Sequence, residues 1–449
     1  MNVRTLPFLV LAAVAAVALI PRATPSIPTG DPIVGADVAW MLCATGLVLL
    51  MTPGLSFFYG GMVRFKNVVS TMLQSFVALG VISLLWVVVG FSLAFGDSLG
   101  GVIGNPLTFF MFDGVGAATH PDLAPTFPLL LFALFQMKFA IITPALITGA
   151  FAERVRFSSY LLFMMLFSIV IYAPLAHMTW HPGGLLRTWG VLDFAGGTVV
   201  HMSAGLAALA GAMVLGRRQS HVANEAHEPA NVPFVLLGTG MLWFGWFGFN
   251  AGSALAANET AVSAFATTNT ASAAAMLGWV FFDMLRGRKP SALGACIGAV
   301  VGLVAITPAA GFVSVRHSIT IGLVAAIVSN LAVHWRTSRS SLDDTLDVFP
   351  CHGVGGMVGM VLTGVFAQES GLVTGQWQTF GIHLAALVLV SVYAFAGSWL
   401  LYRVVDTLWP MRVSRDAETL GLDQSQHGEV AATFDPVRGV PARGLDQVA

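Results

Sequence analysis

The sequence predicts an all-α integral membrane protein with eleven transmembrane helices. Of its 449 residues, 56% are hydrophobic and 10% are charged, and the mean hydropathy is +0.80. A soluble domain carries about 25% charged residues, and a chain with so few cannot cover its surface with polar groups. The apolar residues fall into blocks of about 20, the length that a helix needs to cross a bilayer. The net charge of −1 shows no excess of basic residues of the kind that binds a nucleic acid.

The first 25 residues have the pattern of a signal peptide. Arg4 precedes an apolar run over residues 6–20, and Pro, Ser and Thr follow that run. The run matches a signal-peptide core and is short for a transmembrane span. We therefore predict a signal peptide over residues 1–25, with a retained N-terminal segment as the alternative. In both cases the next segment begins on the outer side.

Eleven apolar blocks follow, and short polar segments separate them. The predicted spans are 37–60, 67–95, 127–149, 158–179, 194–216, 232–254, 261–285, 291–308, 318–335, 350–367 and 378–405. The two blocks after Ala257 are rich in Gly and Ala, which are less hydrophobic than Leu, Ile or Val, so the apolar pattern defines these two spans least sharply. Together the spans make a membrane domain over residues 36–405, and residues 406–449 form a cytoplasmic tail.

The distribution of basic residues tests this count, because short cytoplasmic loops carry an excess of Lys and Arg. Loops after odd-numbered spans hold eleven basic residues, whereas loops after even-numbered spans hold only Arg187 and Arg316. A span missed in mid-chain would destroy this alternation. The pattern places the N-terminus outside and the C-terminus inside. An odd count suits two inverted five-helix repeats plus one extra helix.

Ionisable groups inside a membrane span are costly and usually functional, and two of the histidines within predicted spans lie on faces of small residues. His201 in the fifth span shares a helix face with Gly205, and His352 in the tenth span shares one with Gly356. Small residues beside each imidazole predict a narrow space or a close helix contact. Either each histidine only hydrogen-bonds a neighbouring helix, or the two form one functional site. A metal site is disfavoured because no suitable third ligand recurs nearby.

Aromatic side chains repeat at helical spacing in the third and sixth spans. Such a face is often only core or lipid contact, but with a hydroxyl group it suits a small cation, through cation–π attraction and a hydrogen bond. Trp180 adds an aromatic ring at the outer end of the fourth span. The two faces consist of Phe135 and Phe139, and of Trp246, Phe249 and Ser253.

Two aspartates stand at the start of the histidine-bearing spans. Asp193 opens the fifth span, where a carboxylate caps a helix or favours a nearby positive charge. Asp347 precedes the tenth span on the cytoplasmic side, and we expect it to cap that helix in the same way.

Longer motifs run through most of the spans. They include PGLSFFYGGMVRFKN, FQMKFAIITPALITGAFAERVRF, AHMTWHPGG, DFAGGTVVH, WFGFNAGSALAANE, DVFPCHGVGGMVG and, in the tail, GLDQSQHGE. In this combination the sequence closely resembles the ammonium transporter family, Amt/Mep/Rh, from about residue 37 to residue 429.

The resemblance implies a multi-pass transporter of the cytoplasmic membrane, without cofactor, that forms a homotrimer with one pore per subunit. It further implies that the tail binds a nitrogen-signalling protein of the PII family. Trp180, Phe139 and Ser253 would bind ammonium on the outer side, Phe139 and Phe249 would form a gate, and His201 and His352 would line the pore. The supporting residues would be Asp193, Phe135, Gln136, Trp246 and, from its capping position, Asp347.

Lys138 stands inside the third span beside Phe139, where an uncharged residue is the default in a membrane. One helix step of about 100° turns it away from the face of Phe135 and Phe139. Two explanations stay open: it pairs with an acid across a helix or subunit interface, or it changes the electrostatics of the outer site.

The predicted function is ammonium uptake in which the outer site recruits ammonium, a proton is removed, and ammonia passes along the histidines. A bare cation in an apolar pore is very costly, whereas ammonia is neutral. The alternatives are a passive gas channel for ammonia or carbon dioxide, as in the Rh branch, and an ammonium sensor. An enzyme is disfavoured because the sequence shows no activated nucleophile and no cofactor motif.

Overall fold

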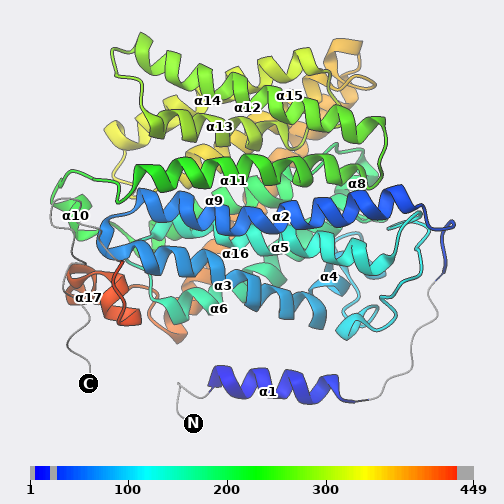
Figure 1. The fold of residues 1–449 in the computed structure, drawn as a ribbon, viewed down its shortest axis with the longest axis horizontal. Coiled ribbons are helices and arrows are strands. Elements are labelled where there is room, and N and C mark those ends of the chain that lie inside the picture. The colour runs from blue at the N-terminus through cyan, green and yellow to red at the C-terminus, as the bar shows by residue number, and fades with distance from the viewer. Residues whose placement is uncertain (1–5, 21–27, 432–449) are drawn as a thin grey trace.

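Long helices lie side by side in the computed structural model, which describes residues 6–20 and 28–431 (Figure 1). The first of them, α1 (Leu6–Ala18), keeps most of its side chains exposed and lies beside the bundle. Residues 1–5 and 21–25 of the predicted signal peptide lie outside the described residues. The signal peptide therefore stays a prediction.

Two sets of helices build the bundle. The first set is α2 (Gly35–Met62), α3 (Val68–Leu85), α4 (Phe91–Phe95), α5 (Leu129–Phe151), α6 (Phe157–Phe167), α7 (Ala173–Trp180) and α9 (Ser203–Leu215). The second is α11 (Val232–Ala251), α12 (Glu259–Leu285), α13 (Ala292–Ile306), α14 (Val315–Arg339), α15 (Gly355–Phe366) and α16 (Trp377–Leu408). A short outer hairpin, β1 (Ser98–Leu99) and β2 (Ile103–Gly104), joins the first set.

Several of these helices continue through a wider π-helical turn, a feature frequent at functional sites. The turn η2 (Trp86–Gly90) links α3 to α4, and η4 (Ser168–Tyr172) links α6 to α7. Two others, η5 (Gly197–Met202) and η7 (Phe349–Val354), begin the helices that end as α9 and α15. These last two contain the predicted histidines.

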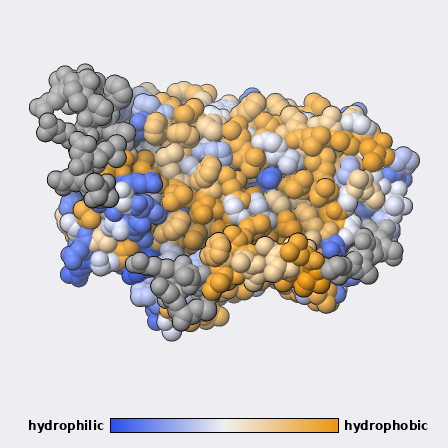
Figure 2. Space-filling view, turned by 60° about the horizontal axis from the view of Figure 1, so that its bottom comes forward, coloured by the Kyte–Doolittle hydropathy of each residue, from blue (hydrophilic) through white to orange (hydrophobic). Residues whose placement is uncertain are grey.

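The membrane class is confirmed. In the described part of the chain, nine helices are long and apolar enough to cross a membrane, and Figure 2 shows a broad apolar surface between hydrophilic ends. The predicted spans 261–285 and 291–308 are also helical, as α12 and α13. However, α13 has only 15 residues, and the 27-residue α12 is too polar to qualify as a span. The count of eleven stays a prediction.

The two sets meet along α2 and α11, which run side by side in Figure 1. Glycines on both helices remove side chains from this contact. A Cβ added at Gly54 would lie 2.9 Å from the Cβ of Met241, and one added at Gly248 would lie 2.6 Å from the Cβ of Leu47. Small residues allow such close packing of membrane helices.

Buried ion pairs join the cytoplasmic loops. The guanidinium group of Arg218, after α9, bonds the carboxylates of Asp343 and Glu153 at 2.8 Å each. Arg154, fully buried after α5, donates to the backbone oxygen of Asp343 and to the hydroxyl of Thr345. Burial alone would raise the pKa of Asp343, but the hydrogen bonds from Arg218 and the charges of Arg154 and Arg218 hold it well below its ordinary value. Three loops are thus tied at one point.

The tail folds back over these loops through α17 (Arg415–Leu420) and η9 (Asp423–His427). The carboxylate of Asp423 accepts the backbone N–H of Ser70, at the start of α3, at 2.7 Å. Lys66 donates to the backbone oxygen of Glu418, and the Glu418 carboxylate accepts the N–H of Gln219 at 2.6 Å. The tail therefore contacts loops from two parts of the inner surface.

We predict that Asp343→Asn lowers the stability of the protein by roughly 3–5 kcal/mol, because it leaves the buried charge of Arg218 under-compensated. The folded-state pKa of Asp343 lies below the unfolded value, so its contribution is present above about pH 4 and disappears as the pH falls further. Thermal unfolding in detergent at several pH values measures both effects. As a control, Glu225→Gln breaks the exposed pair with Arg64 and should cost less than about 1 kcal/mol. Equal losses in the two variants would contradict the assignment.

Candidate functional site

A cavity of about 510 Å³ lies at the outer ends of α5, α7 and the 3-10 turn η6 (Gly252–Ala254), which follows α11. The three residues predicted for the outer site, Phe139, Trp180 and Ser253, line it together with Gln136, which was predicted as a supporting residue. Lys138 is not among the lining residues, in agreement with its predicted turn away from this face.

The side chains of Ser253 and Gln136, which line this cavity, each carry an oxygen with lone pairs that no described residue uses. The Ser253 hydroxyl donates its proton to the backbone oxygen of Phe249 at 2.8 Å, which leaves its own lone pairs free. The side-chain oxygen of Gln136 is buried and accepts no hydrogen bond from the described residues. With the rings of Phe139 and Trp180 in the same cavity, these oxygens suit a small cation that carries N–H donors.

Asp193 lines the same cavity, but its carboxylate oxygens accept hydrogen bonds from backbone N–H groups. It accepts the N–H groups of Gly196, Gly197 and Thr198 at 2.8, 2.6 and 2.7 Å, and the Thr198 hydroxyl as well. Of the two predicted roles, the structure therefore shows helix capping, at the start of η5. The backbone oxygen of Asp193 also accepts the indole N–H of Trp180 at 3.2 Å, which orients that ring.

Gly196 makes this turn possible. Its φ of +113° is a backbone conformation that residues with side chains rarely adopt. A Cβ at this position would also lie 3.2 Å from the Trp180 ring. The cap and the tryptophan therefore both depend on glycine here.

Stacked phenyl rings close the floor of the outer cavity. The centroids of Phe139 and Phe249 are 4.1 Å apart and the ring planes differ by 28°. Phe135 meets Phe139 edge-on at 4.9 Å, and Trp180 meets it edge-on at 5.9 Å. Phe139 lines the outer cavity, whereas Phe249 lines the space below. The two rings thus separate the outer cavity from the interior.

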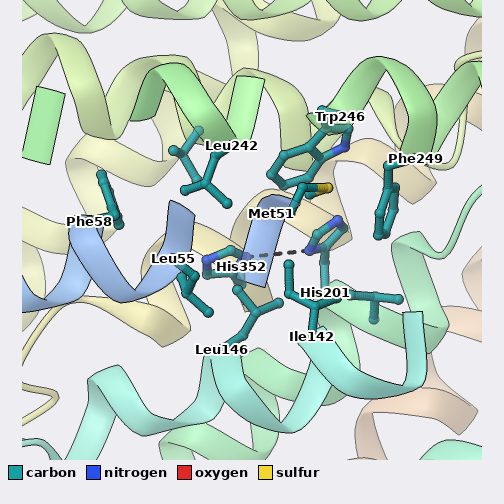
Figure 3. Close-up of a pocket in the computed structure, with 12 residues that line it drawn as sticks. Met51, Leu55, Phe58, Ile142, Leu146, His201, Leu242, Trp246, Phe249 and His352 are labelled. Carbon is teal, nitrogen blue, oxygen red and sulfur yellow. Dashed lines mark hydrogen bonds between the residues drawn. The ribbon is translucent and has the colours of Figure 1, made fainter. Parts of the chain in front are cut away.

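The two histidines lie below these rings and face each other. Their Nδ1 atoms are 3.3 Å apart, within hydrogen-bond distance (Figure 3). The cavity beside them holds about 10 Å³, room for one water at most. Its walls are otherwise apolar, with Met51, Leu55, Phe58, Ile142, Leu146, Val200, Leu242, Trp246, Phe249 and Val300 around the histidines.

The hydrogen bond between the histidines fixes their tautomers relative to each other. Because Nδ1 of one ring must donate to Nδ1 of the other, a neutral pair always has opposite tautomers. The other nitrogen of His201, Nε2, is buried without a partner among the described residues, on the side of Trp246 and Phe249 in Figure 3. Trp246 stacks on His201 at 5.3 Å and is held by a hydrogen bond from its indole N–H to Thr307.

A close crossing of the two histidine-bearing helices brings the rings together. A Cβ added at Gly205 would collide with the backbone of Gly353, and one added at Gly356 would lie 3.2 Å from the Cβ of His201. The predicted small-residue faces are therefore a helix contact, and the histidines lie beside it.

The prediction that Asp347 caps the tenth span is wrong. The carboxylate that accepts the N–H groups of Val348 and Phe349 belongs to Asp344, at 3.0 and 2.8 Å. Asp347 has a left-handed backbone, with a φ of +58°, and its side chain pairs with Arg336 instead. Burial and the charge of Asp347 raise the pKa of Asp344 to about 6, against the opposing charge of Arg336.

Sequence reasoning missed Asp344 although a signal was present. Each histidine follows its capping aspartate by eight positions, 193 to 201 and 344 to 352. Two other missed residues support the site from a distance. His383 accepts the N–H of Leu192 at 3.0 Å, next to Asp193, and Thr307 holds Trp246.

Comparisons with known proteins identify the family. The profile of the Ammonium Transporter Family matches residues 39–432. The chain is 45% identical to the ammonium transporter Amt1 of Archaeoglobus fulgidus, over 88% of this chain and 99% of that protein. It is also 45% identical to the ammonium transporter of Aquifex aeolicus, over 88% and 93%.

Solved structures show the same architecture. The crystal structure of Mep2 from Saccharomyces cerevisiae superposes with a TM-score of 0.82 at 34% identity, over 92% of this chain and 95% of that one. A structure described as a Sensor Amt Protein gives a TM-score of 0.81 at 29% identity, over 87% and 98%.

We predict that Gly205→Ala destabilises the protein by about 1–3 kcal/mol or more, because the added methyl group meets backbone that cannot move aside. The matched control is Gly80→Ala on α3, where the added Cβ has no atom within 4 Å other than those of its own helical turn. That control should be neutral or stabilising by about 0.5–1 kcal/mol, the gain in helix propensity. Thermal unfolding in detergent compares the two, and a stable Gly205→Ala protein would disprove the tight crossing.

Proposed function

The chain belongs to the ammonium transporter family, and on that basis we propose that it takes up ammonium across the cytoplasmic membrane by recruiting, deprotonating and conducting it. Its relatives are named as transporters, and this chain too is a membrane transporter and not an enzyme. The three steps correspond to the outer cavity, the phenyl gate and the histidine pair.

Recruitment takes place in the outer cavity. Ammonium donates hydrogen bonds to the hydroxyl oxygen of Ser253 and the amide oxygen of Gln136, and the faces of Trp180 and Phe139 attract its charge. The support is that no described residue uses the lone pairs of these two oxygens, and that Ser253 and Gln136 line one cavity together with Trp180 and Phe139. Asp193 contributes by orienting Trp180 and not by direct contact.

Deprotonation takes place at the gate, where ammonium transfers a proton to Nε2 of His201, next to Phe249, and continues as ammonia. Below Phe139 and Phe249 the lumen is narrow and apolar, so an ammonium ion would lose its hydration without compensation. Ammonia avoids this cost because it is neutral. Potassium cannot avoid it, because it has no proton to release, and this difference excludes it.

Conduction depends on the histidine pair. The observation that carries the proposal is the buried, unpartnered Nε2 of His201 in an otherwise apolar lumen. This nitrogen offers a hydrogen bond to ammonia, and the Nδ1–Nδ1 contact links it to His352. A proton that enters at one ring can leave from the other, with both tautomers exchanged.

An ammonium sensor is the second candidate, favoured by the likeness to a Sensor Amt Protein. A passive channel for neutral gas is the third. Electrical recording separates them, because proton-coupled transport carries a steady current, a neutral channel carries none, and a sensor turns over slowly.

We further propose that the protein is a homotrimer with one pore per subunit, and that a PII-family protein binds at the tail. The resemblance to the family supports both. For the second, the packing of α17 and η9 across the inner loops supplies a surface next to the cytoplasmic face.

We expect replacement of both pore histidines, His201→Ala with His352→Ala, to lower the ammonium current by about tenfold or more, because proton transfer loses its relay. Reconstituted protein on a supported membrane, pulsed with ammonium and separately with potassium, gives the measurement. The control variant, His221→Ala with His334→Ala, removes two histidines outside the pore. Unchanged ammonium current and potassium exclusion in the pore variant would refute the relay.

We expect Ser253→Ala to raise the half-saturating ammonium concentration about fivefold, the effect of one lost hydrogen bond, while the maximal current stays near that of the wild type. Ser253→Thr keeps the hydroxyl group and should restore most of the affinity. The recruitment step would be wrong if the alanine variant lowered the maximal current alone.

A further inference from the structure

Lys138 is a basic residue inside the membrane helix α5, and it lines neither the outer cavity nor the histidine cavity. On α5 the more open positions of the outer half are Leu130, Leu134 and Lys138, which follow one another at intervals of four and so share one face. That face points away from the bundle. Lys138 therefore lies on the outer surface of the subunit.

The position of Lys138 along α5 places it far from water. It is nine residues from the outer end of the helix, or about 14 Å at the rise of an α-helix. Lysines near helix ends extend to the membrane surface, but one this deep has no such route. A charge here calls for a polar partner.

Within the described part of one subunit Lys138 lacks such a partner. The one hydrogen-bond contact of its ammonium group there is to the sulfur of Met137, at 3.7 Å, and no described carboxylate lies within ion-pair distance. An acid across a helix, one of the explanations left open by the sequence, is therefore absent from the described part of the subunit.

A second isolated polar group lies on the opposite set of helices, in α12. Four consecutive polar residues, Thr267 to Thr270, interrupt this helix. Thr267, Thr268 and Thr270 all donate to backbone oxygens of the protein. Asn269 is exposed, and no hydrogen bond of its side chain occurs within the described residues. It shares its face with the exposed Val262, Phe265 and Leu277.

The two polar groups match in depth and in chemistry. Asn269 is ten residues from the outer end of α12, or about 15 Å, close to the value for Lys138. An ammonium group offers only donors, and an amide oxygen is an acceptor. Each group thus supplies what the other lacks, but the two lie on different faces of one subunit.

We propose that the α5 face of one subunit docks on the α12 face of the next, with Lys138 donating to the side-chain oxygen of Asn269 of the neighbouring copy. Contact between two different faces is head-to-tail, and such contacts close into a ring when the rotation permits. The proposal rests on the proposed homotrimer and identifies its interface. It also explains how α12 remains in the membrane despite its polarity.

Cross-linking tests this interface directly. Cys43, Cys296 and Cys351 are first replaced by alanine, and Lys138→Cys and Asn269→Cys are then introduced into the same chain. A short bifunctional maleimide is the reagent, because two long side chains in contact hold their backbones further apart than a disulfide permits. In membranes we expect covalent dimers and a trimer as the largest species. Either substitution alone should give no covalent oligomer.

The matched control combines Lys138→Cys with Val388→Cys. Val388 is 60% exposed on α16 and lies about 16 Å from the outer end of that helix. Equal cross-linking in this control would overturn the interface. The same holds if Lys138→Cys with Asn269→Cys gives no cross-link while native mass spectrometry still shows an oligomer. Ammonium current is recorded separately, so a failure to transport would count against the proposed function alone.

A double-mutant cycle at residues 138 and 269 provides a second test that does not need cysteines. Asn269→Asp should strengthen the contact with Lys138 and raise the temperature at which the oligomer dissociates in detergent. In the Lys138→Met background the same aspartate lacks its partner and should lower that temperature. Shifts of the same sign in both backgrounds would overturn the pairing.

Discussion

Two helix backbones touch near the centre of this protein, where Gly205 meets Gly353, and the pore is arranged around that contact. No side chain fits between them, so the helices approach closely enough for His201 and His352 to bond each other. Each of these helices begins with a wider turn capped by a buried aspartate, Asp193 at the outer end and Asp344 at the inner end. The same local design, used once from each side of the membrane, is what an inverted repeat would produce.

The membrane class and several residues that line the two cavities could be predicted from sequence because both depend on local patterns. Hydropathy located the helices, and helical spacing placed Phe139, Trp246 and Phe249 on faces that do line the cavities. The capping residue was missed because Asp347 is nearer to the helix in sequence, and its left-handed backbone, which a helical pattern does not reveal, turns it out of the capping position. The signal for the correct residue, Asp344, was the spacing of eight positions between aspartate and histidine, which both helices share. Thr307 and His383 were missed because they reach the site from other helices. The roles of the site residues stay proposals.

Charge has two separate uses in this chain. Arg154 and Arg218 first marked the cytoplasmic side by their position in loops, and the structure shows that they also tie those loops together through Asp343 and Glu153. Residues that orient the chain during insertion therefore also stabilise the finished fold. Lys138 has neither use, and its isolation within the subunit is the reason that we assign it to contact with another copy.

The small size of the inner cavity has a consequence for the cell. A space of about 10 Å³ beside the histidines, closed on the outer side by two stacked rings, has no room for a continuous file of water molecules. Protons hop rapidly along such files, and a membrane pierced by one would discharge its own electrochemical gradient. A lumen this narrow would keep the bilayer electrically insulating while the transporter is idle.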